Sequence, residues 1–355
     1  MTAPDGPSDM ASRTAHKPKT VSVVIPTRNY GRYLGEAIHS LRRQDYPDWE
    51  CVVVDDGSTD GTVDTAAALA ASDRRIAYVR QAASGPSAAR NAGLAATDGE
   101  FVQFLDADDL LGRHKLQHQV EVFARHPEAD IVYGGVRYFF AADTDDAERT
   151  ARRWTEGPTR GVASGRGESV LAALIDDNFM VMEAPLIRRS LIEKVGGFDP
   201  RIRKMEDWEF WLRCALAGAY FVYDGAGDDD SLPHVRIHGS SSSQDQIAMH
   251  EAAVQVRRGI ENQLATPGLH RLNRTRIHEH LAVVGMLEGL SGRLGLGMRC
   301  LLKAGFGERK MRWVAWALLM PAVRHRPGSW MMSRLRAVRA RRRGEEVRDW
   351  QAHWP

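Results

Sequence analysis

The chain has 355 residues, of which 43% are hydrophobic and 26% are charged, and its formal net charge is +2. This is the composition of a globular protein, and a charge near zero excludes nucleic-acid binding driven by overall charge. The three cysteines show no spacing typical of a metal site or a disulfide framework, which indicates free thiols in a reducing compartment. No apolar run approaches the length that spans a bilayer.

The first 20 residues lack the apolar core of a secretory signal, so we expect a disordered leader on a cytoplasmic protein. From residue 21, β-branched runs alternate with segments of helical periodicity. Strands are predicted at 21–26, 50–56, 75–80, 100–109 and 130–135, and helices at 30–44, 62–71, 86–96 and 115–125. This order predicts an α/β fold with a mainly parallel sheet and helices on both faces.

The second half is predicted to contain loops and then helices. Residues 141–167 are polar and are expected to form an excursion or a lid. Further helices are expected near 168–176, near 189–195 and from residue 206, followed by a loop at 224–243 and by helices to the end. We place a domain boundary near residue 244, which gives a leader (1–20), an α/β domain (21–244) and a basic helical extension (245–355).

Polar clusters follow three of the predicted strands, at 26–29, 55–58 and 106–109. In open parallel sheets, ligands bind at the carboxyl ends of the strands. These clusters are therefore expected to line one site.

Asp106 and Asp108 form an Asp-x-Asp pair after an apolar strand. Two carboxylates in one small volume repel each other unless a cation or a hydrogen-bonding ligand lies between them. Mg²⁺ and Mn²⁺ prefer such oxygen ligands together with substrate phosphates. The alternative is that these acids cap the following helix, for which Asp109 is the better candidate.

The segment DDGSTDGT (55–62) allows several interpretations. A calcium loop of the EF-hand type is excluded, because Ala67 stands where that loop needs a glutamate. Asp60 suits a helix cap, and Asp55 or Asp56 can accept hydrogen bonds from a base or a ribose. The spacing alone does not decide between these roles.

The segments in combination resemble the family 2 glycosyltransferases. Four segments match in order and spacing: VSVVIPTRNY (21–30), CVVVDDGSTDGT (51–62), GPSAARNAGL (85–94) and FVQFLDADD (101–109). Two later ones are also similar: GGFDPRIRKMEDWEFWLR (196–213) and VRIHGSSSS (235–243). The resemblance covers roughly 21–244. It implies the GT-A fold and an inverting transfer of a sugar from a nucleotide-diphosphate sugar, for which UDP is the nucleotide expected, to a hydroxyl acceptor.

The resemblance also implies a role for each matching residue. It assigns donor binding to Pro26, Thr27, Asp55, Asp56, Arg90 and Asp106. It assigns a divalent metal, Mn²⁺ or Mg²⁺, to Asp106, Asp108 and His238. It assigns removal of the acceptor proton to Asp207, with Glu206 beside it, and stabilisation of the leaving diphosphate to the metal and Arg90. The alternative for Glu206 and Asp207 is that of ordinary acids at a helix N-terminus.

Basic and apolar residues alternate near the end of the chain. There is no acid from Arg309 to Gly344, and 324–343 contains eight arginines interleaved with Trp, Met and Leu. This pattern is typical of a segment lying on an anionic membrane, which would place the protein peripherally at the inner face of the cell membrane, near lipid-linked glycan acceptors. The alternative is a helical appendage with a solvated basic tail. The arginines lack an ordered nucleic-acid-binding motif, so no nucleic-acid partner is expected.

Two other enzyme classes fit less well. A dinucleotide oxidoreductase needs G-x-G-x-x-G after the first strand, which is absent. A nucleotidyltransferase normally has a glycine-rich loop there, where this chain offers only Gly31. A non-catalytic sugar-nucleotide binding or scaffold protein is the alternative from a different functional class. The family resemblance implies a role in the synthesis of a cell-envelope polysaccharide or glycan, whereas the sugar, the acceptor and the linkage do not follow from the sequence.

Overall fold

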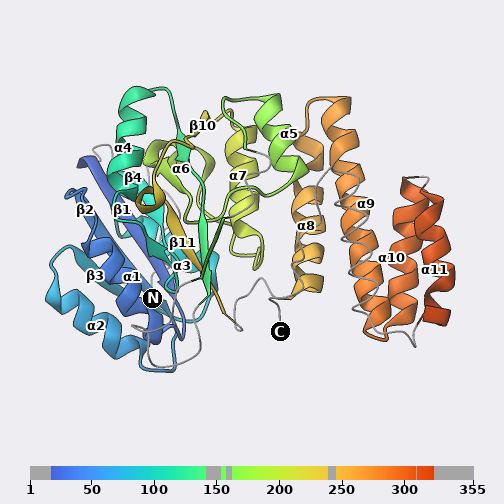
Figure 1. Ribbon diagram of the computed structural model, residues 1–355, viewed down its shortest axis with the longest axis horizontal. Coiled ribbons are helices and arrows are strands. Elements are labelled where there is room, and N and C mark those ends of the chain that lie inside the picture. The colour runs from blue at the N-terminus through green and yellow to red at the C-terminus, as the bar shows by residue number, and fades with distance from the viewer. Residues whose placement is uncertain (1–16, 141–152, 157–161, 239–244, 309, 324–355) are drawn as a thin grey trace, which may run out of the picture. The chain divides into compact units, whose positions relative to one another are not determined.

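The computed structural model describes residues 17–140, 153–156, 162–238, 245–308 and 310–323 (Figure 1). By their internal contacts, residues 1–273 and 274–355 form two separate units, and each is described by itself.

A mixed sheet forms the centre of the first unit. Its seven strands lie in the order β10-β6-β9-β4-β1-β2-β3. Their bounds are β1 (Lys17–Thr27), β2 (Trp49–Asp56), β3 (Ile76–Gln81), β4 (Gly99–Phe104), β6 (Ile131–Tyr133), β9 (Pro185–Arg188) and β10 (Phe221–Tyr223). Only β9 runs antiparallel to its neighbours β4 and β6 among these described pairs. The prediction of a mainly parallel sheet is confirmed.

Helices cover both faces of this sheet. Successive side chains of a strand point to opposite faces, so the apolar strands contribute residues to two buried clusters, one on each face. Val23 and Val53 belong to one buried cluster, which α1 (Gly31–Arg42), α2 (Thr62–Ser72) and α4 (Lys115–Arg125) complete. Val24 and Val52 belong to the other cluster. That cluster is completed by α3 (Pro86–Ala95), α5 (Glu168–Asp176), α6 (Arg189–Val195), α7 (Glu206–Leu216) and α8 (Gln246–Ile260).

A second, four-stranded sheet has the order β5-β11-β7-β8. Its strands are β5 (Leu110–Leu111), β7 (Arg137–Phe140), β8 (Arg153–Glu156) and β11 (Pro233–Ile237). Outside this sheet, short 3-10 turns lie at Asp229–Ser231 and Glu261–Gln263. The prediction of a loop throughout 224–243 is therefore wrong, because β11 pairs with β7 and β5 within it. The predicted excursion at 141–167 contains β8, while 141–152 and 157–161 lie outside the described residues.

Two predicted boundaries also change. β1 begins at Lys17, whose backbone N–H donates to the Asp98 carbonyl at 3.1 Å, so the last four residues of the predicted leader belong to the sheet. The strand predicted at 100–109 ends at Phe104, because the backbone N–H of Asp109 donates to the Asp106 carbonyl at 3.0 Å. The acids thus lie in a turn rather than in the strand.

The first unit continues past the predicted boundary at residue 244. In α8, the buried Arg257 donates to the Ile175 carbonyl and lies 4.5 Å above the Trp208 ring. Helix α8 is therefore part of the core of the first unit. The division of the chain into domains at residue 244 stays a prediction.

The second unit contains the last part of α9 (Pro267–Leu290), α10 (Leu294–Gly307) and α11 (Met311–Val323). Its core consists of Ala282, Met286, Leu301, Ala304, Trp313 and Ala317. The predicted helical extension is confirmed as far as Val323, and residues 324–355 lie outside the described part. Among the described helices, none combines the length and the apolar character needed to cross a membrane.

Replacing Gly93 with alanine tests how closely α3 packs on β1. A Cβ at Gly93 would lie 2.3 Å from Cγ1 of the buried Val24, whose β-branched side chain has little freedom to move. We expect Gly93→Ala to lower the free energy of unfolding by about 1–3 kcal/mol in chemical denaturation. The control is Gly35→Ala in α1, where a Cβ meets nothing within 4 Å and where helix propensity predicts a gain of up to about 1 kcal/mol. Equal stability of Gly93→Ala and the wild type would contradict this packing.

Candidate functional site

The loops that follow β1 and β2 are joined at the carboxyl end of the sheet. Thr27 and Asp55 are register partners at the ends of these strands. Asn29 adopts a left-handed conformation with φ of 60°, and its side-chain Oδ1 accepts a hydrogen bond of 2.8 Å from the Thr59 N–H. The Asn29 N–H donates to Ser58 Oγ at 3.0 Å. The two predicted polar clusters therefore form one rigid rim.

Asp55 is fully buried and already bound by its own chain. Its carboxylate accepts from the Ser58 N–H at 2.7 Å and from the Tyr78 hydroxyl at 3.0 Å. These bonds fix the orientation of the carboxylate beside Thr27. A base or ribose would meet an acid held in place before it binds.

Asp56 accepts three hydrogen bonds from the chain that leads into α3. Its donors are the Ser84 N–H at 2.7 Å, the Gly85 N–H at 2.8 Å and Gln81 Nε2 at 2.8 Å. The carboxylate thus anchors the loop that begins α3. The donor-binding role implied for Asp56 stays a prediction.

Thr27 carries a buried polar atom with no partner among the described residues. Its side chain is 4% exposed, and its Oγ1 makes no hydrogen bond to any described group. An unsatisfied buried hydroxyl costs free energy until a ligand supplies the missing bond. Pro26 precedes it in β1 and is partly buried opposite Val54. This end of β1 therefore suits a polar ligand.

Three carboxylates meet where β4 ends. Oxygen atoms of Asp106, Asp109 and Glu183 all lie within 4.8 Å of one another. Glu183 is buried just before β9, and sequence reasoning missed it. The available signal was a single acid inside the apolar stretch FMVMEAPLI (179–187). Burial, followed by the charges of the neighbouring acids, raises the pKa of Asp109 and of Glu183 well above the ordinary values.

Asp108 and His238 form a second group beside this cluster. Nε2 of His238 lies 2.8 Å from Oδ2 of Asp108, and the buried imidazole lies next to the rings of Tyr33 and Tyr30, with centroids 5.3 and 5.9 Å away. His238 directly follows strand β11, which positions it beside Asp108. Burial and the charges of Asp108 and Asp106 raise the pKa of Tyr30 to about 12, so its hydroxyl keeps its proton.

Arg90 connects helix α7 to the turn after β4 that carries Asp106, Asp108 and Asp109, which we call the acid turn. Its guanidinium is 3% exposed and donates to Asp106 Oδ1 and to Glu206 Oε1, both at 2.7 Å. Both terminal nitrogens are thus bound by carboxylates of the protein. In this structure Arg90 joins two acidic segments, which the sequence did not predict.

Asp207 is the second residue of α7 and is partly buried. The Asn178 side-chain amide donates to its Oδ2 at 3.1 Å. Burial, and then the charge of Glu206, raise the pKa of Asp207 to about 6. Trp208 and Trp211 behind it are core residues whose indole N–H groups bond to the Leu174 and Met180 carbonyls. The start of α7 is thereby held rigidly.

The acids of the site suit a divalent cation. Carboxylate oxygens of Asp106, Asp109 and Glu183 lie together, and the Asp108 carboxylate pairs with the His238 imidazole beside them, which gives a hard and mostly oxygen donor set. Burial, and then the charges of the neighbouring acids, raise the pKa of Asp109 and of Glu183. A bound cation would favour the ionised form of these carboxyls. Metal binding by Asp106, Asp108 and His238 stays a prediction.

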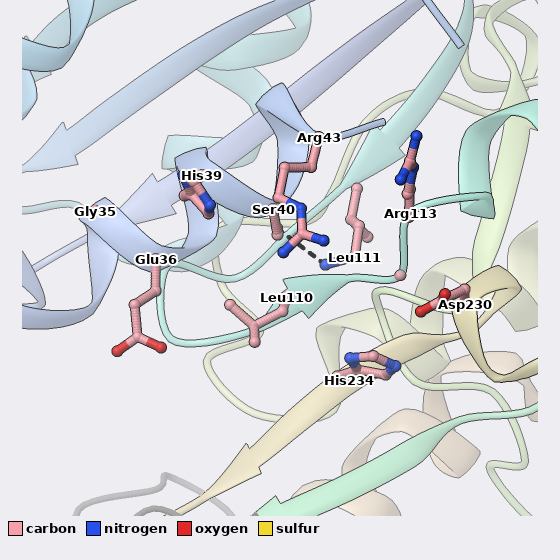
Figure 2. Close-up of a pocket in the computed structure, with 11 residues that line it drawn as sticks. Gly35, Glu36, His39, Ser40, Arg43, Leu110, Leu111, Arg113, Asp230 and His234 are labelled. Carbon is pink, nitrogen blue, oxygen red and sulfur yellow. Dashed lines mark hydrogen bonds between the residues drawn. The ribbon is translucent and has the colours of Figure 1, made fainter. Parts of the chain in front are cut away.

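A groove of about 560 Å³ lies between α1, β5 and β11, next to the site (Figure 2). Arg43, His39 and Glu36 of α1 line one side, and Arg113 and His234 line the other. None of the predicted site residues lines it.

One ion pair connects this groove to the acid turn. Glu36, which lines the groove, accepts from Arg236 Nη2 at 3.1 Å. Arg236 Nε donates in turn to the Asp108 carbonyl at 2.7 Å, and its backbone N–H donates to Asp109 at 2.7 Å. The groove is thus a neighbour of the predicted site rather than the site itself.

The role of Asp56 can be tested through stability. In Asp56→Asn an amide N–H₂ replaces one oxygen of the buried carboxylate, so a part-buried backbone donor of Ser84 or Gly85 loses its partner, and we expect the free energy of unfolding to fall by about 1–3 kcal/mol. The matched control is Asp64→Asn on the exposed surface of α2, with a change within about 0.5 kcal/mol. Unchanged stability of Asp56→Asn combined with weaker UDP binding would instead make Asp56 a donor ligand.

Comparison with known proteins shows what the chain resembles. The family model described as Glycosyl transferase family 2 matches residues 22–195. An uncharacterized glycosyltransferase of Nostoc sp. is 32% identical over 261 residues, which cover 66% of this chain and 72% of the relative. The putative teichuronic acid biosynthesis glycosyltransferase TuaG of Bacillus subtilis is 41% identical over 102 residues, covering 28% of this chain and 40% of TuaG.

Solved structures match over more of the chain. The structure of S. aureus TarS 1-349 in complex with UDP-GlcNAc superposes with a TM-score of 0.57 over 93% of each chain, at 18% sequence identity. At that identity the match concerns the fold. It agrees with the α/β architecture and the helical C-terminal region described above.

Proposed function

This chain belongs to glycosyl transferase family 2, and we propose that it is an inverting enzyme that transfers a sugar from a UDP-sugar to a hydroxyl of a glycan or lipid-linked glycan. We further propose that it works on the cytoplasmic side in the synthesis of a cell-envelope polysaccharide. The complex of TarS with UDP-GlcNAc and the teichuronic acid assignment of TuaG support the donor and the pathway class. One observation carries the proposal: Arg90 binds both Glu206, at the start of α7, and Asp106, in the acid turn. Asp207, the next residue of α7, is bound by Asn178 instead.

The donor nucleoside binds at the end of β1 in this proposal. The Thr27 hydroxyl, which has no partner among the described residues, forms a hydrogen bond with the nucleoside as donor or as acceptor. Asp55 offers the nucleoside a carboxylate that the N–H of Ser58 holds in orientation. Pro26 shapes the rim, and Asp56 holds the loop into α3. The diphosphate then points toward the acid turn at Asp106.

The metal site of the proposal lies at that turn. Asp106, Asp108 and His238 would hold Mn²⁺ or Mg²⁺, and the buried carboxyls of Asp109 and Glu183 lie beside Asp106. When bound, the cation offsets the charge of the diphosphate leaving group. The Tyr30 hydroxyl, which keeps its proton, is a hydrogen-bond donor next to these acids.

Asp207 is the general base of the proposed reaction. Its pKa of about 6 leaves roughly nine-tenths of the carboxylate ionised at pH 7, close to the value that suits proton abstraction at that pH. Glu206 is a weaker candidate, because its carboxylate is bound to the buried Arg90 guanidinium. Asn178 orients the Asp207 carboxylate, which accepts the acceptor proton as the acceptor oxygen attacks the anomeric carbon.

Arg90 acts as a positioning residue in this mechanism rather than as a donor ligand. Its two terminal nitrogens already bind Asp106 and Glu206, so little of the guanidinium is left for the diphosphate. It fixes the distance between the end of β4 and the start of α7. The donor and the base are thereby held in one geometry.

Asp207→Asn separates an enzyme from a binding protein. We expect the variant to lose about 100- to 10,000-fold in turnover, because the amide cannot accept the proton. Its affinity for UDP should stay unchanged, because Asp207 does not touch the nucleotide in this proposal. For the wild type, kcat/KM should rise with pH through about 6, since Asp207 must be ionised, and this limb should disappear in the variant.

The measurement is UDP release from a panel of UDP-sugars, with water as a slow acceptor when the natural acceptor is missing. Full activity of Asp207→Asn would exclude it as the base. UDP binding by the wild type without any UDP release would favour the non-catalytic binding protein.

A further inference from the structure

Exposed apolar side chains are concentrated in the second unit. Six large hydrophobic residues are exposed among the described residues, and five of them lie in α10 and α11. These five are Leu296, Phe306, Met311, Leu318 and Leu319, whereas the first unit contributes Val162 alone. Scattered single residues need no explanation, but such a concentration in one helical pair marks an interaction surface.

Helix α11 is apolar on both of its sides. Trp313 and Ala317 pack into the core of the second unit. On the other side, Met311, Leu318 and Leu319 are 64%, 67% and 55% exposed, and the exposed Ala315 lies between them. Residues at i, i+4, i+7 and i+8 share one face of a helix, so these four form a continuous stripe, which we call the outer stripe. Figure 1 shows α11 in red beside α10.

Exposed basic residues occur on the same two helices as the exposed apolar ones. Arg299 and Lys303 are exposed on α10, and Arg312 is exposed within α11. The acid nearest in sequence, Glu308, is bound by Thr275 and His278 at 3.0 and 3.1 Å. Beyond α11, the chain adds eight arginines in 324–343 without an acid. Apolar side chains and positive charge therefore occur together in this region.

We propose that the outer stripe of α11, with the exposed bases of α10 and α11, binds the surface of an anionic lipid bilayer. An apolar helical face flanked by Lys and Arg inserts at the headgroup boundary, and its bases attract anionic lipids. A second copy of the chain fits less well, because a face-to-face dimer would bring Arg299, Lys303 and Arg312 against their own counterparts. The basic segment 324–343 is also a poor candidate to cover the outer stripe, because its arginines carry the same sign of charge as the exposed bases of α10 and α11. The inference stands whether or not the proposed sugar transfer is correct.

The test is co-sedimentation of the full chain with two kinds of vesicle. One kind contains phosphatidylcholine alone, and the other contains phosphatidylcholine mixed with phosphatidylglycerol. We expect binding to the anionic vesicles that weakens with salt, and little binding to the neutral ones. In the double variant Leu318→Gln/Leu319→Gln, we expect binding to fall about tenfold or more, since each leucine gives up its burial in the bilayer. Because both side chains are exposed, thermal unfolding should stay unchanged.

The matched control is Val162→Gln, an exposed apolar residue of the first unit, which should bind vesicles like the wild type. Equal binding by the double variant and the wild type would overturn the proposal and leave the arginine segment as the membrane contact. Absence of binding to anionic vesicles would overturn it as well. A concentration-dependent dimer in sedimentation equilibrium that the double variant abolishes would assign the outer stripe to a second copy instead.

Discussion

A single buried guanidinium sets the arrangement of the site. Arg90 on α3 reaches between Asp106, in the turn after β4, and Glu206, the first residue of α7. Removing one partner from a buried ion pair typically costs about 3–5 kcal/mol, which applies to the mostly buried pair with Glu206, whereas solvent screens the pair with the 38% exposed Asp106 side chain. The acid turn, α3 and α7 therefore cannot move independently. This constraint places Asp207 at a fixed position relative to the end of β4, where the donor phosphate is proposed to lie.

The rest of the site follows from an excess of acid that one guanidinium cannot balance. Two unit charges about 5 Å apart repel by roughly 3 kcal/mol at an effective dielectric constant of about 20. Burial, together with this repulsion, raises the pKa values of Asp109 and Glu183 well above the ordinary range, so they keep protons that carboxylates normally release. Such a cluster is a natural place for a divalent cation and for the diphosphate that the cation binds. The same excess of charge and burial, acting more weakly on Asp207, yields a pKa suited to a base near neutral pH.

Local periodicity was sufficient to predict β1 to β4, β6 and α1 to α4, and the helices at 168–176, at 189–195 and from residue 206, but it did not predict the short strand β5. It was insufficient for β9 and β11, which are short and acquire their strand character from pairing with distant segments. Glu183 was missed with β9, since its proximity to Asp106 exists only once β9 lies beside β4. The partners of Arg90 escaped prediction for a similar reason: a motif shows that an arginine is present, but not which carboxylates the fold brings to it. The family resemblance identified the segments that form the site, whereas the hydrogen bonds and ion pairs that join these segments follow only from the structure.

The central claim is that the carboxyl ends of β1, β2 and β4 form a metal-assisted site for a nucleoside diphosphate. Calorimetric titration of the full chain with UDP, in the presence and absence of Mn²⁺, tests it most directly. UDP should bind more tightly with Mn²⁺ than without it, and Asp108→Ala should remove the effect of the metal while the folded state persists. If UDP does not bind under either condition, or if Mn²⁺ leaves its affinity unchanged in the wild type, the proposed site is contradicted.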